Sequence, residues 1–368
     1  MQPLMRLSRR SMLQGLGAVP TAAMIPSIAA AGVVQSDLGK RRIGAAIRPE
    51  QLMKGAALEP LIRRDCDLLV PEYHGHWSAV EWVEGSPYHG NYDAIVDYAR
   101  ATGKTVRGHS LIWQQMTPDW AKAAMARDRD WNLVRSHFAS LLPRYRGKIG
   151  EWIVVNEMID TEDGDDGIRR TSFQQAFGND YVARALESAH EFDPDSRLMI
   201  NDYSLYHDNP VDRRRRARLL RLVDSLKSAG VPLHAVGIQG HIELAKGAVA
   251  QAELSAFLRE LAQMGVTLDI TELDVLEDNR NADLDHRDQT VAGAIEALID
   301  VVVDEPAVKS IVTWGLSDRD SWLQERSDAT RTAQVCSPVD CNGLNRGLPY
   351  DGALRSKPMR TVLERFAA

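Results

Sequence analysis

Short apolar runs alternate with longer amphipathic stretches from residue 42 onward. Eight runs rich in β-branched residues predict strands, at 42–47, 67–73, 105–112, 151–157, 197–203, 235–241, 267–274 and 310–316. Between and after them, apolar residues recur at helical spacing and predict helices over 51–65, 91–103, 131–147, 179–192, 210–230, 252–265, 289–305 and 357–368. Gly103, Gly230 and Gly265 end three of these helices and suit left-handed caps.

The alternation of strand and helix predicts parallel strand pairing. Eight such units predict a closed (β/α)8 barrel, the TIM barrel of the α/β class, as a single domain over residues 42–368. Runs of Val, Ile and Leu fit strands that are buried on both faces. An open doubly wound sheet is the alternative fold. It is disfavoured because no glycine-rich phosphate-binding loop follows the first predicted strand.

The first 31 residues have the pattern of a signal peptide. Arg9 and Arg10 precede a weakly apolar stretch that closes on small residues around 29–31, which is typical of the twin-arginine type. Pro20 and Pro26 interrupt the apolar stretch, so we expect no membrane span there. We expect residues 32–41 to form a linker to the barrel domain. We expect the protein to be exported, to the periplasm or out of the cell.

Charge and cysteine content narrow the possible partners. The formal net charge of the 368-residue chain is −7, which argues against a nucleic-acid partner. Separately, we expect the protein to be a monomer. The arginine run at 213–216 falls in a predicted helix, and we interpret it as a solvated face. Cys336 and Cys341 could pair in an oxidising compartment, whereas Cys66 follows the helical pattern into an apolar run and should be buried.

The ends of the predicted strands carry most of the candidate chemistry. In a barrel of this kind the active site lies at the C-terminal strand ends. Glu157 and Glu272 each follow an uninterrupted apolar run, on the fourth and seventh strands, and therefore face each other across the ring. Carboxylates that face each other across a cleft are what glycoside hydrolysis needs. The polar strand ends and the nearby aromatic residues are Glu72, His109, Trp113, Asn156, Glu157, Asn201, Asp202, Gln239, His241, Glu272, Asp274, Trp314 and Trp322.

Six segments resemble glycoside hydrolase family 10, the retaining endo-β-1,4-xylanases. They are "GHSLIWQQMTPDW", "WIVVNEM", "INDY", "VGIQGH", "ITELD" and "TWGLSDRDSWL", in the family's order, and the resemblance covers about residues 42 to 360. It implies that Glu157 is the general acid/base and Glu272 the nucleophile. It also implies that Asn156 binds the sugar 2-hydroxyl, and that His241 hydrogen-bonds Glu272 and is held by Asp274.

The resemblance also implies a substrate-binding set and a pKa shift. We expect the pKa of Glu157 to be raised by the charge of Glu272 and by partial burial. No cofactor and no metal are expected, because His74 and His76 have no assignable third and fourth metal ligands. The substrate is expected to be a xylan-like polysaccharide or oligosaccharide. The expected binding residues are Glu72, Tyr73, His76, His109, Trp113, Gln239, Trp314 and Trp322.

Two segments depart from the family's pattern. In "PEYHGHW", Glu72 matches, but Tyr73 stands where the family has Asn and His76 where it has Lys. Gln114 and Met116 likewise replace the usual His and Gln after the third strand. In the family, the positions of Tyr73 and His76 bind the sugars on the non-reducing side, and an imidazole and a phenol differ from an ammonium and an amide in donor count and shape. We therefore predict altered specificity, for a decorated xylo-oligosaccharide or another β-linked glycan or glycoside.

Two functions of other classes remain as alternatives. A carbohydrate-binding barrel without catalysis would have no need for both Glu157 and Glu272. A barrel isomerase or lyase acting on a phosphorylated or metal-bound sugar is disfavoured because no glycine-rich phosphate loop follows the seventh or eighth strand. The residues leave open whether cleavage is internal or terminal.

Overall fold

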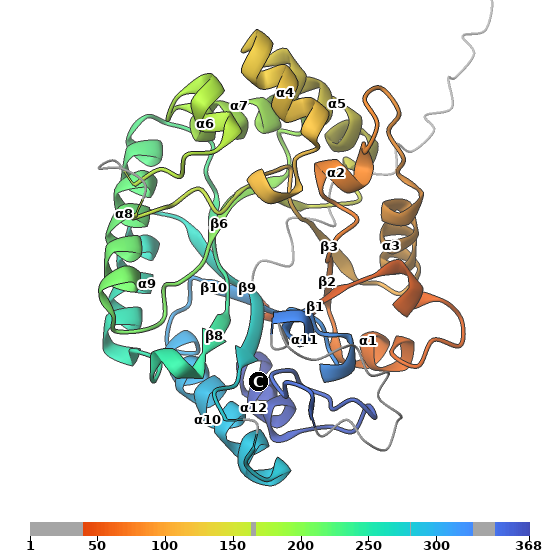
Figure 1. Cartoon of the computed structure of the whole chain (residues 1–368), viewed down its shortest axis with the longest axis vertical. Coiled ribbons are helices and arrows are strands. Elements are labelled where there is room, and N and C mark those ends of the chain that lie inside the picture. Colours follow the sequence, from red (N-terminus) through yellow and green to blue (C-terminus); the bar gives the residue numbers. More distant parts are fainter. Residues whose placement is uncertain (1–39, 163–166, 280, 327–342) are drawn as a thin grey trace, which may run out of the picture.

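A closed barrel of parallel strands forms the centre of the molecule, and helices surround it (Figure 1). The computed structural model describes residues 40–162, 167–279, 281–326 and 343–368. Pairing of the last strand with the first closes the ring, so the predicted single-domain (β/α)8 barrel is confirmed. The barrel strands, in order, are β1 (Arg42–Ile47), β2 (Leu68–Pro71), β3 (Thr105–Gly108), β5 (Glu151–Asn156), β6 (Arg197–Asp202), β7 (Ala235–Ile238), β9 (Thr267–Leu276) and β10 (Val308–Thr313).

Two short strands extend the barrel at the end where the long strands finish. They are β4 (Ile112–Trp113), which pairs with β5, and β8 (His241–Glu243), which pairs with β9. Both pairings are parallel. Trp113 and His241 are thereby placed beside Asn156 and Asp274, their partners in register.

Eight helices match the predicted ones in position. They are α1 (Glu59–Asp65), α3 (Gly90–Ala101), α5 (Asn132–Tyr145), α7 (Tyr181–Phe192), α8 (Pro210–Ser228), α9 (Gln251–Gln263), α10 (Leu284–Val302) and α12 (Pro358–Ala367). Gly103, Gly230 and Gly265 have φ angles of 70°, 72° and 77°, as the predicted caps require. The helix predicted over 51–65 was too long, because a 3-10 turn and a left-handed Gly55 precede α1.

Several short elements were not predicted. They are the helices α2 (Trp77–Val80), α4 (Asp119–Asp128), α6 (Ser172–Phe177) and α11 (Leu323–Arg326), and the 3-10 turns η2 (Pro49–Leu52), η3 (Gln114–Met116), η4 (Leu244–Lys246) and η5 (Asp318–Asp320). Most of them lie in the loops that follow the C-terminal strand ends. They build the rim of the barrel mouth, so their positions bear on the site.

The arginine run at the start of α8 corrects the sequence interpretation. Arg213 and Arg214 are exposed, but Arg215 and Arg216 are buried. Arg215 pairs with Asp202 at the end of β6, and Arg216 donates to backbone carbonyls of the loop between β6 and α8. Two arginines of the run are therefore solvated, and the other two bind the loop between β6 and α8. They can do so because two consecutive positions of the helix face the barrel.

The structure confirms the prediction for Cys66, whereas the other cysteine predictions and the predicted signal peptide concern residues that it does not describe. Cys66 is buried, as expected. Cys336 and Cys341, and the predicted signal peptide at 1–31, lie outside the described residues. Among the helices that the structure describes, none has the length and apolar character needed to cross a membrane.

Candidate active site

Glu157 occupies the first position after β5. Its φ angle is +58°, in the left-handed region that residues with side chains seldom adopt. The backbone amide of Glu157 donates to the carbonyl of Asn201 (2.8 Å), and the Arg169 guanidinium donates to the Glu157 carbonyl (2.9 Å). These contacts hold the strained residue at the C-terminal end of the barrel, where the sequence placed it. Such strain is concentrated at functional sites.

The pKa of Glu157 is raised to about 7. Burial is the largest cause, followed by the negative charge of Asp202 and then by that of Glu272. The sequence predicts the effects of burial and of the Glu272 charge on this pKa, but not the effect of Asp202. The ion pair with Arg215 holds Asp202 in the interior. At neutral pH a substantial fraction of Glu157 therefore carries a proton.

Glu272 lies in β9 and is 5% exposed. Its Oε1 accepts a hydrogen bond from Asn201 Nδ2 (2.6 Å), and its Oε2 accepts one from His241 Nε2 (3.2 Å). Thr271 Oγ1 donates to Asn201 Oδ1 (2.6 Å) and so fixes the orientation of the Asn201 amide. Each oxygen of Glu272 thus has a donor, which suits a carboxylate held in one orientation.

His241 links Glu272 to Asp274. Its Nδ1 lies 2.8 Å from Asp274 Oδ1, and the Trp322 indole donates to Asp274 Oδ2 (2.6 Å). Burial lowers the pKa of His241, but the charge and hydrogen bond of Asp274 and those of Glu272 outweigh it and raise the pKa to about 10. At neutral pH the imidazole is therefore a cation, with both nitrogens donating. This is the arrangement that the resemblance implied for His241 and Asp274.

Three amide side chains connect the surroundings of the two glutamates. Asn156 Oδ1 accepts from Asn201 Nδ2 (2.8 Å) and from Gln239 Nε2 (3.3 Å). Because Oδ1 receives both bonds, Nδ2 of Asn156 is the group that can donate to a substrate hydroxyl. Gln239 Nε2 also lies 3.4 Å from Glu157 Oε1. Asn201 therefore contacts both Asn156 and Glu272.

The sequence does not predict the roles of two residues around the glutamates. Asn201 is predicted only as a polar strand end, although its place on β6, the strand next to β5, puts it beside Asn156. Gln115 has no predicted role, yet its Nε2 lies 3.4 Å from Glu157 Oε2. Nothing in the pattern around Gln115 distinguishes it from a surface residue of the η3 turn.

Aromatic rings line the same end of the barrel. Trp314 is 9% exposed and lies edge-on to His109 (5.2 Å between ring centroids) and to His241 (6.3 Å). The Trp322 ring lies 5.0 Å from that of His241. His109 is buried, and burial keeps its pKa well below the usual value, so the ring is neutral. Trp314 and Trp322, two of the aromatic residues predicted to bind sugar, are thus packed around His241.

The segment that departs from the family's pattern forms the wall next to Trp113. His76 is buried, and its ring lies 4.9 Å from His109 and 5.0 Å from Trp113. Its Nδ1 accepts from the backbone amide of Ser110 (3.3 Å), and burial lowers the pKa of His76 to about 3. His76 is therefore a neutral part of the wall. It does not supply the charge of the lysine that it replaces.

The other two residues of this segment have different surroundings. Glu72 Oε2 accepts from Arg48 Nε (2.9 Å), and Arg48 also donates to the backbone carbonyl of Asp320 (2.6 Å). Tyr73 is 45% exposed, with its ring edge-on to His74 (5.5 Å). Within the described ranges, no group of three or more His, Cys, Asp or Glu side chains is arranged to hold a metal ion.

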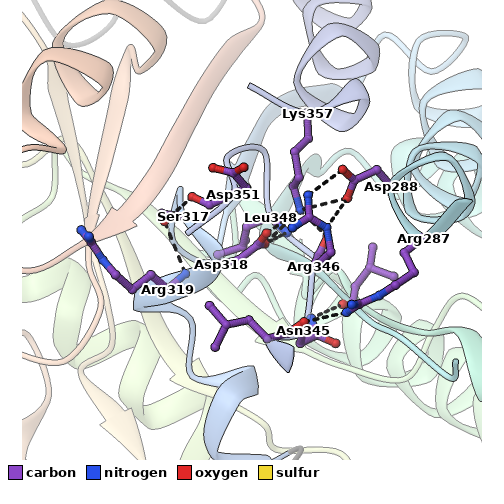
Figure 2. A network of polar contacts seen from close by, with 12 residues as sticks. Arg287, Asp288, Ser317, Asp318, Arg319, Asn345, Arg346, Leu348, Asp351 and Lys357 are labelled. Carbon is purple, nitrogen blue, oxygen red and sulfur yellow. Dashed lines mark hydrogen bonds and ion pairs between the residues drawn. The ribbon is translucent and has the colours of Figure 1, made fainter. Parts of the chain in front are cut away.

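A buried polar network holds the loop that carries Trp314 and Trp322 (Figure 2). Lys357 Nζ lies 3.0 Å and 2.8 Å from the two carboxylate oxygens of Asp318, which is in η5. Arg346 makes a two-fold contact with Asp288 of α10, with both distances 2.7 Å. The network therefore ties the loop after β10 to α10 and to the segment that precedes α12.

The two glutamates have the environments that a glycoside hydrolase requires. One has a pKa near neutrality and can give and take a proton, while the other is held as an acceptor by two donors. The fold and the site thus define a barrel glycoside hydrolase. The family model of glycosyl hydrolase family 10 matches residues 32–364, and the chain belongs to that family. The resemblance of the six sequence segments is confirmed.

Several known proteins similar to the chain are described as xylanases. The β-1,4-xylanase of Dictyoglomus thermophilum is 32% identical over 279 residues, which cover 72% of this chain and 75% of that protein. Endo-1,4-β-xylanase 2 of Claviceps purpurea is 31% identical over 293 residues, 78% of this chain and 82% of that protein. The solved structure of TsXylA, an intracellular xylanase from Thermoanaerobacterium saccharolyticum, has a TM-score of 0.74 and 28% identity, and the match covers 88% of this chain and 95% of that one.

Proposed function

We propose that the chain is a retaining glycoside hydrolase that cleaves β-1,4 linkages in xylan or a related polysaccharide by double displacement. The observation that carries the proposal is the contrast between Glu157, with its pKa of about 7, and Glu272, with a donor on each oxygen. The similarity to proteins named xylanases supports xylan as the substrate.

In the first step Glu157 acts as an acid and Glu272 as a nucleophile. Glu157 gives its proton to the glycosidic oxygen as the bond to the leaving sugar breaks, and Glu272 attacks the anomeric carbon from the opposite face. This forms a covalent glycosyl ester. Asn156 Nδ2 donates to the neighbouring sugar hydroxyl, a contact that strengthens in the transition state.

In the second step Glu157 acts as a base. Loss of its proton in the first step leaves a carboxylate that accepts a proton from water, and the water oxygen attacks the anomeric carbon. The ester bond to Glu272 breaks, and the sugar is released with its original configuration. The His241 cation then faces a free carboxylate again, which stabilises the leaving Glu272.

Steady-state assays test this proposal. Wild type, Glu157→Ala and Glu272→Ala are compared on xylan, on β-glucan and on aryl β-xylosides. We expect xylan to be the preferred polymer and Glu272→Ala to be inactive on every substrate. We expect Glu157→Ala to keep activity only on aryl glycosides whose leaving group needs no proton. Full activity of Glu272→Ala would contradict the proposed mechanism. Faster hydrolysis of β-glucan than of xylan would contradict xylan as the substrate.

We further propose that the non-reducing side of the cleft has altered specificity. His76 is a buried neutral ring and Tyr73 is an exposed phenol, so neither presents the ammonium or the amide that the family has at these positions. Fewer hydrogen bonds to sugar hydroxyls should weaken binding of unsubstituted xylose units there. Cleavage patterns of xylohexaose test this idea. We expect products that show weak use of the non-reducing subsites, and a pattern typical of the family would contradict it.

Export and oligomeric state are also proposals. The arginine pair at 9 and 10 and the apolar stretch after it support export through a twin-arginine-type signal. Fractionation of cells that express wild type and an Arg9→Lys, Arg10→Lys variant tests it, because the variant should remain in the cytoplasm. A monomer in solution is expected, and light scattering after size-exclusion chromatography tests that.

A further inference from the structure

Within the described residues, the exposed large apolar side chains lie in the two connections that follow β1 and β2. Among the described residues, five such side chains are exposed: Met53, Tyr73, Trp82, Val83 and Tyr88. All of them lie in the segments that leave the C-terminal ends of β1 and β2. Single exposed apolar residues are ordinary on protein surfaces, but a concentration of them in one region marks an interaction surface.

Three of these side chains belong to the loop of residues 81–89, between α2 and α3. In Figure 1 this loop is the orange segment that reaches beyond α2 before the chain turns back into α3. Trp82 is 74% exposed, Val83 58% and Tyr88 62%. Trp82 is more exposed than any other large apolar side chain in the part of the chain that the structure describes.

Hydrogen bonds at its base hold this loop in place. The Glu81 carboxylate accepts from the Trp77 indole (3.3 Å) and from the backbone amide of Gly85 (2.9 Å). The Glu81 carbonyl accepts from the indole of Trp120 in α4 (3.1 Å), and the Tyr88 amide donates to the Val80 carbonyl (2.7 Å). Because these hydrogen bonds already fix the loop backbone, a ligand that binds its aromatic rings would lose little free energy to ordering of the loop.

Close packing also fixes the Tyr88 ring. A Cβ atom at Gly90 would lie 2.4 Å from the Tyr88 hydroxyl oxygen, so the ring passes directly over the first residue of α3. Glycine at this position allows that approach. The ring is therefore held against α3 while 62% of the residue stays accessible.

The exposed loop belongs to the same connection, between β2 and α3, as a residue of the cleft wall. His76, just before α2, contacts His109 and Trp113 in that wall. The exposed loop begins five residues after His76. One connection therefore carries both a wall residue on the side where the non-reducing sugars are expected and the exposed aromatic residues.

The charge of this segment indicates what kind of partner it can bind. Residues 65–99 contain no Lys and no Arg. Anionic lipid surfaces and nucleic acids attract basic patches, so this segment suits neither. Arg127 of α4 interacts electrostatically with Glu84, so the loop's own carboxylate faces this positive charge. Flat aromatic faces suit the apolar faces of neutral sugar rings.

We propose that Trp82, Val83 and Tyr88 form a secondary binding platform for the polysaccharide substrate, on which pyranose rings of a neutral β-linked glycan stack. The platform retains the enzyme on polymer outside the catalytic cleft. The sugar class rests on the proposed function, whereas the platform itself rests on the exposure and fixed geometry of the loop.

Retention on insoluble xylan tests the platform. Wild type is compared with a Trp82→Ala, Tyr88→Ala double variant and with Arg355→Ala, a control whose side chain is 77% exposed on a different loop. We expect the double variant to bind insoluble xylan about fivefold to tenfold more weakly, as the loss of two stacking contacts implies. We expect it to hydrolyse a soluble aryl β-xylobioside with unchanged kcat/KM. Arg355→Ala should match wild type in both assays.

Two results would overturn the platform. One is equal retention of wild type and the double variant on insoluble xylan. The other is concentration-dependent dimerisation of wild type that the double variant loses, since this would assign the patch to self-association. Failure of the proposed function gives a different result, because wild type would then not hydrolyse the soluble xylobioside at all.

Discussion

His241 Nε2 lies 3.2 Å from Glu272 Oε2, and this contact links the proposed nucleophile to a buried positive charge. The opposite nitrogen of His241 lies 2.8 Å from Asp274, which keeps the imidazole protonated and fixes its orientation. Asn201 supplies the donor for the other oxygen of Glu272. The Glu272 carboxylate is thus held by one donor from β6 and one from β8.

Replacement of His241 by Ala should impair the reaction itself. It removes the donor to Glu272 Oε2 and leaves the buried Asp274 with one partner fewer. We expect kcat to fall by about 10²-fold to 10³-fold, in the range seen when one stabilising donor is removed. The loss should be similar on xylan and on activated aryl glycosides, because both need the nucleophile. A loss confined to xylan would instead assign His241 to leaving-group chemistry or to binding of the polymer.

The pH dependence of activity should report the pKa of Glu157. Because Glu157 must carry a proton in the first step, kcat/KM on xylo-oligosaccharides should fall as the pH rises through about 7. Glu157→Gln should lower kcat/KM on these substrates by about 10²-fold to 10⁴-fold. On aryl glycosides with good leaving groups, the variant should lose the decline near pH 7. Persistence of the same decline in Glu157→Gln would assign it to another group.

The same residue should make stability depend on pH. The folded-state pKa of about 7 lies above the ordinary 4.5, so the folded protein binds the Glu157 proton more tightly than the unfolded chain does. Stability is therefore lost as the pH rises from about 4.5 to about 7. At each pH, the effect of Glu157→Gln is the free energy of unfolding of the variant minus that of wild type. We expect this difference to be more favourable to the variant at pH 8 than at pH 4, by about 1–3 kcal/mol. Urea denaturation at both pH values measures this, and an equal effect at the two would contradict it.

The Lys357–Asp318 pair should be important for stability. Both side chains are almost fully buried, at 3% and 1% exposure. Lys357→Met would leave the Asp318 carboxylate buried without its cation, and we expect a loss of about 3–5 kcal/mol in the free energy of unfolding. Arg355→Ala breaks an exposed pair with Asp351 and serves as the control, with an expected loss of at most about 1 kcal/mol. Equal losses in thermal or urea denaturation would show that burial does not set the strength of the pair.

The sequence predicted the barrel and its two glutamates because both follow from local patterns. An apolar run that ends on a carboxylate is visible in the chain around Glu157 and Glu272, and the alternation of elements places both at one end of the barrel. The amide contacts of Asn201 and Gln239 join residues 45 to 83 positions apart, and no local pattern reports them. The sequence also could not show that the barrel buries His76.

The sequence likewise does not show which face of a helix is buried. Arg215 and Arg216 look like a solvated run because four arginines are consecutive, and only the packing of α8 shows that two of them face inward. Helix α4 was missed because "DWAKAAMARD" has no strong apolar periodicity. Its position after β4 is nevertheless important, since its Trp120 contacts the loop with the exposed aromatic residues.

The central claim is that Glu272 forms the covalent intermediate while Glu157 moves the proton. An activated 2-fluoro β-xylobioside tests it most directly, because the fluorine slows both steps and a good leaving group restores the first, so the glycosyl ester accumulates. Mass spectrometry of the digested protein should find the sugar on the peptide that contains Glu272, and Glu272→Gln should remain unlabelled. A label on Glu157, or inactivation of the enzyme without any covalent sugar, would contradict the account.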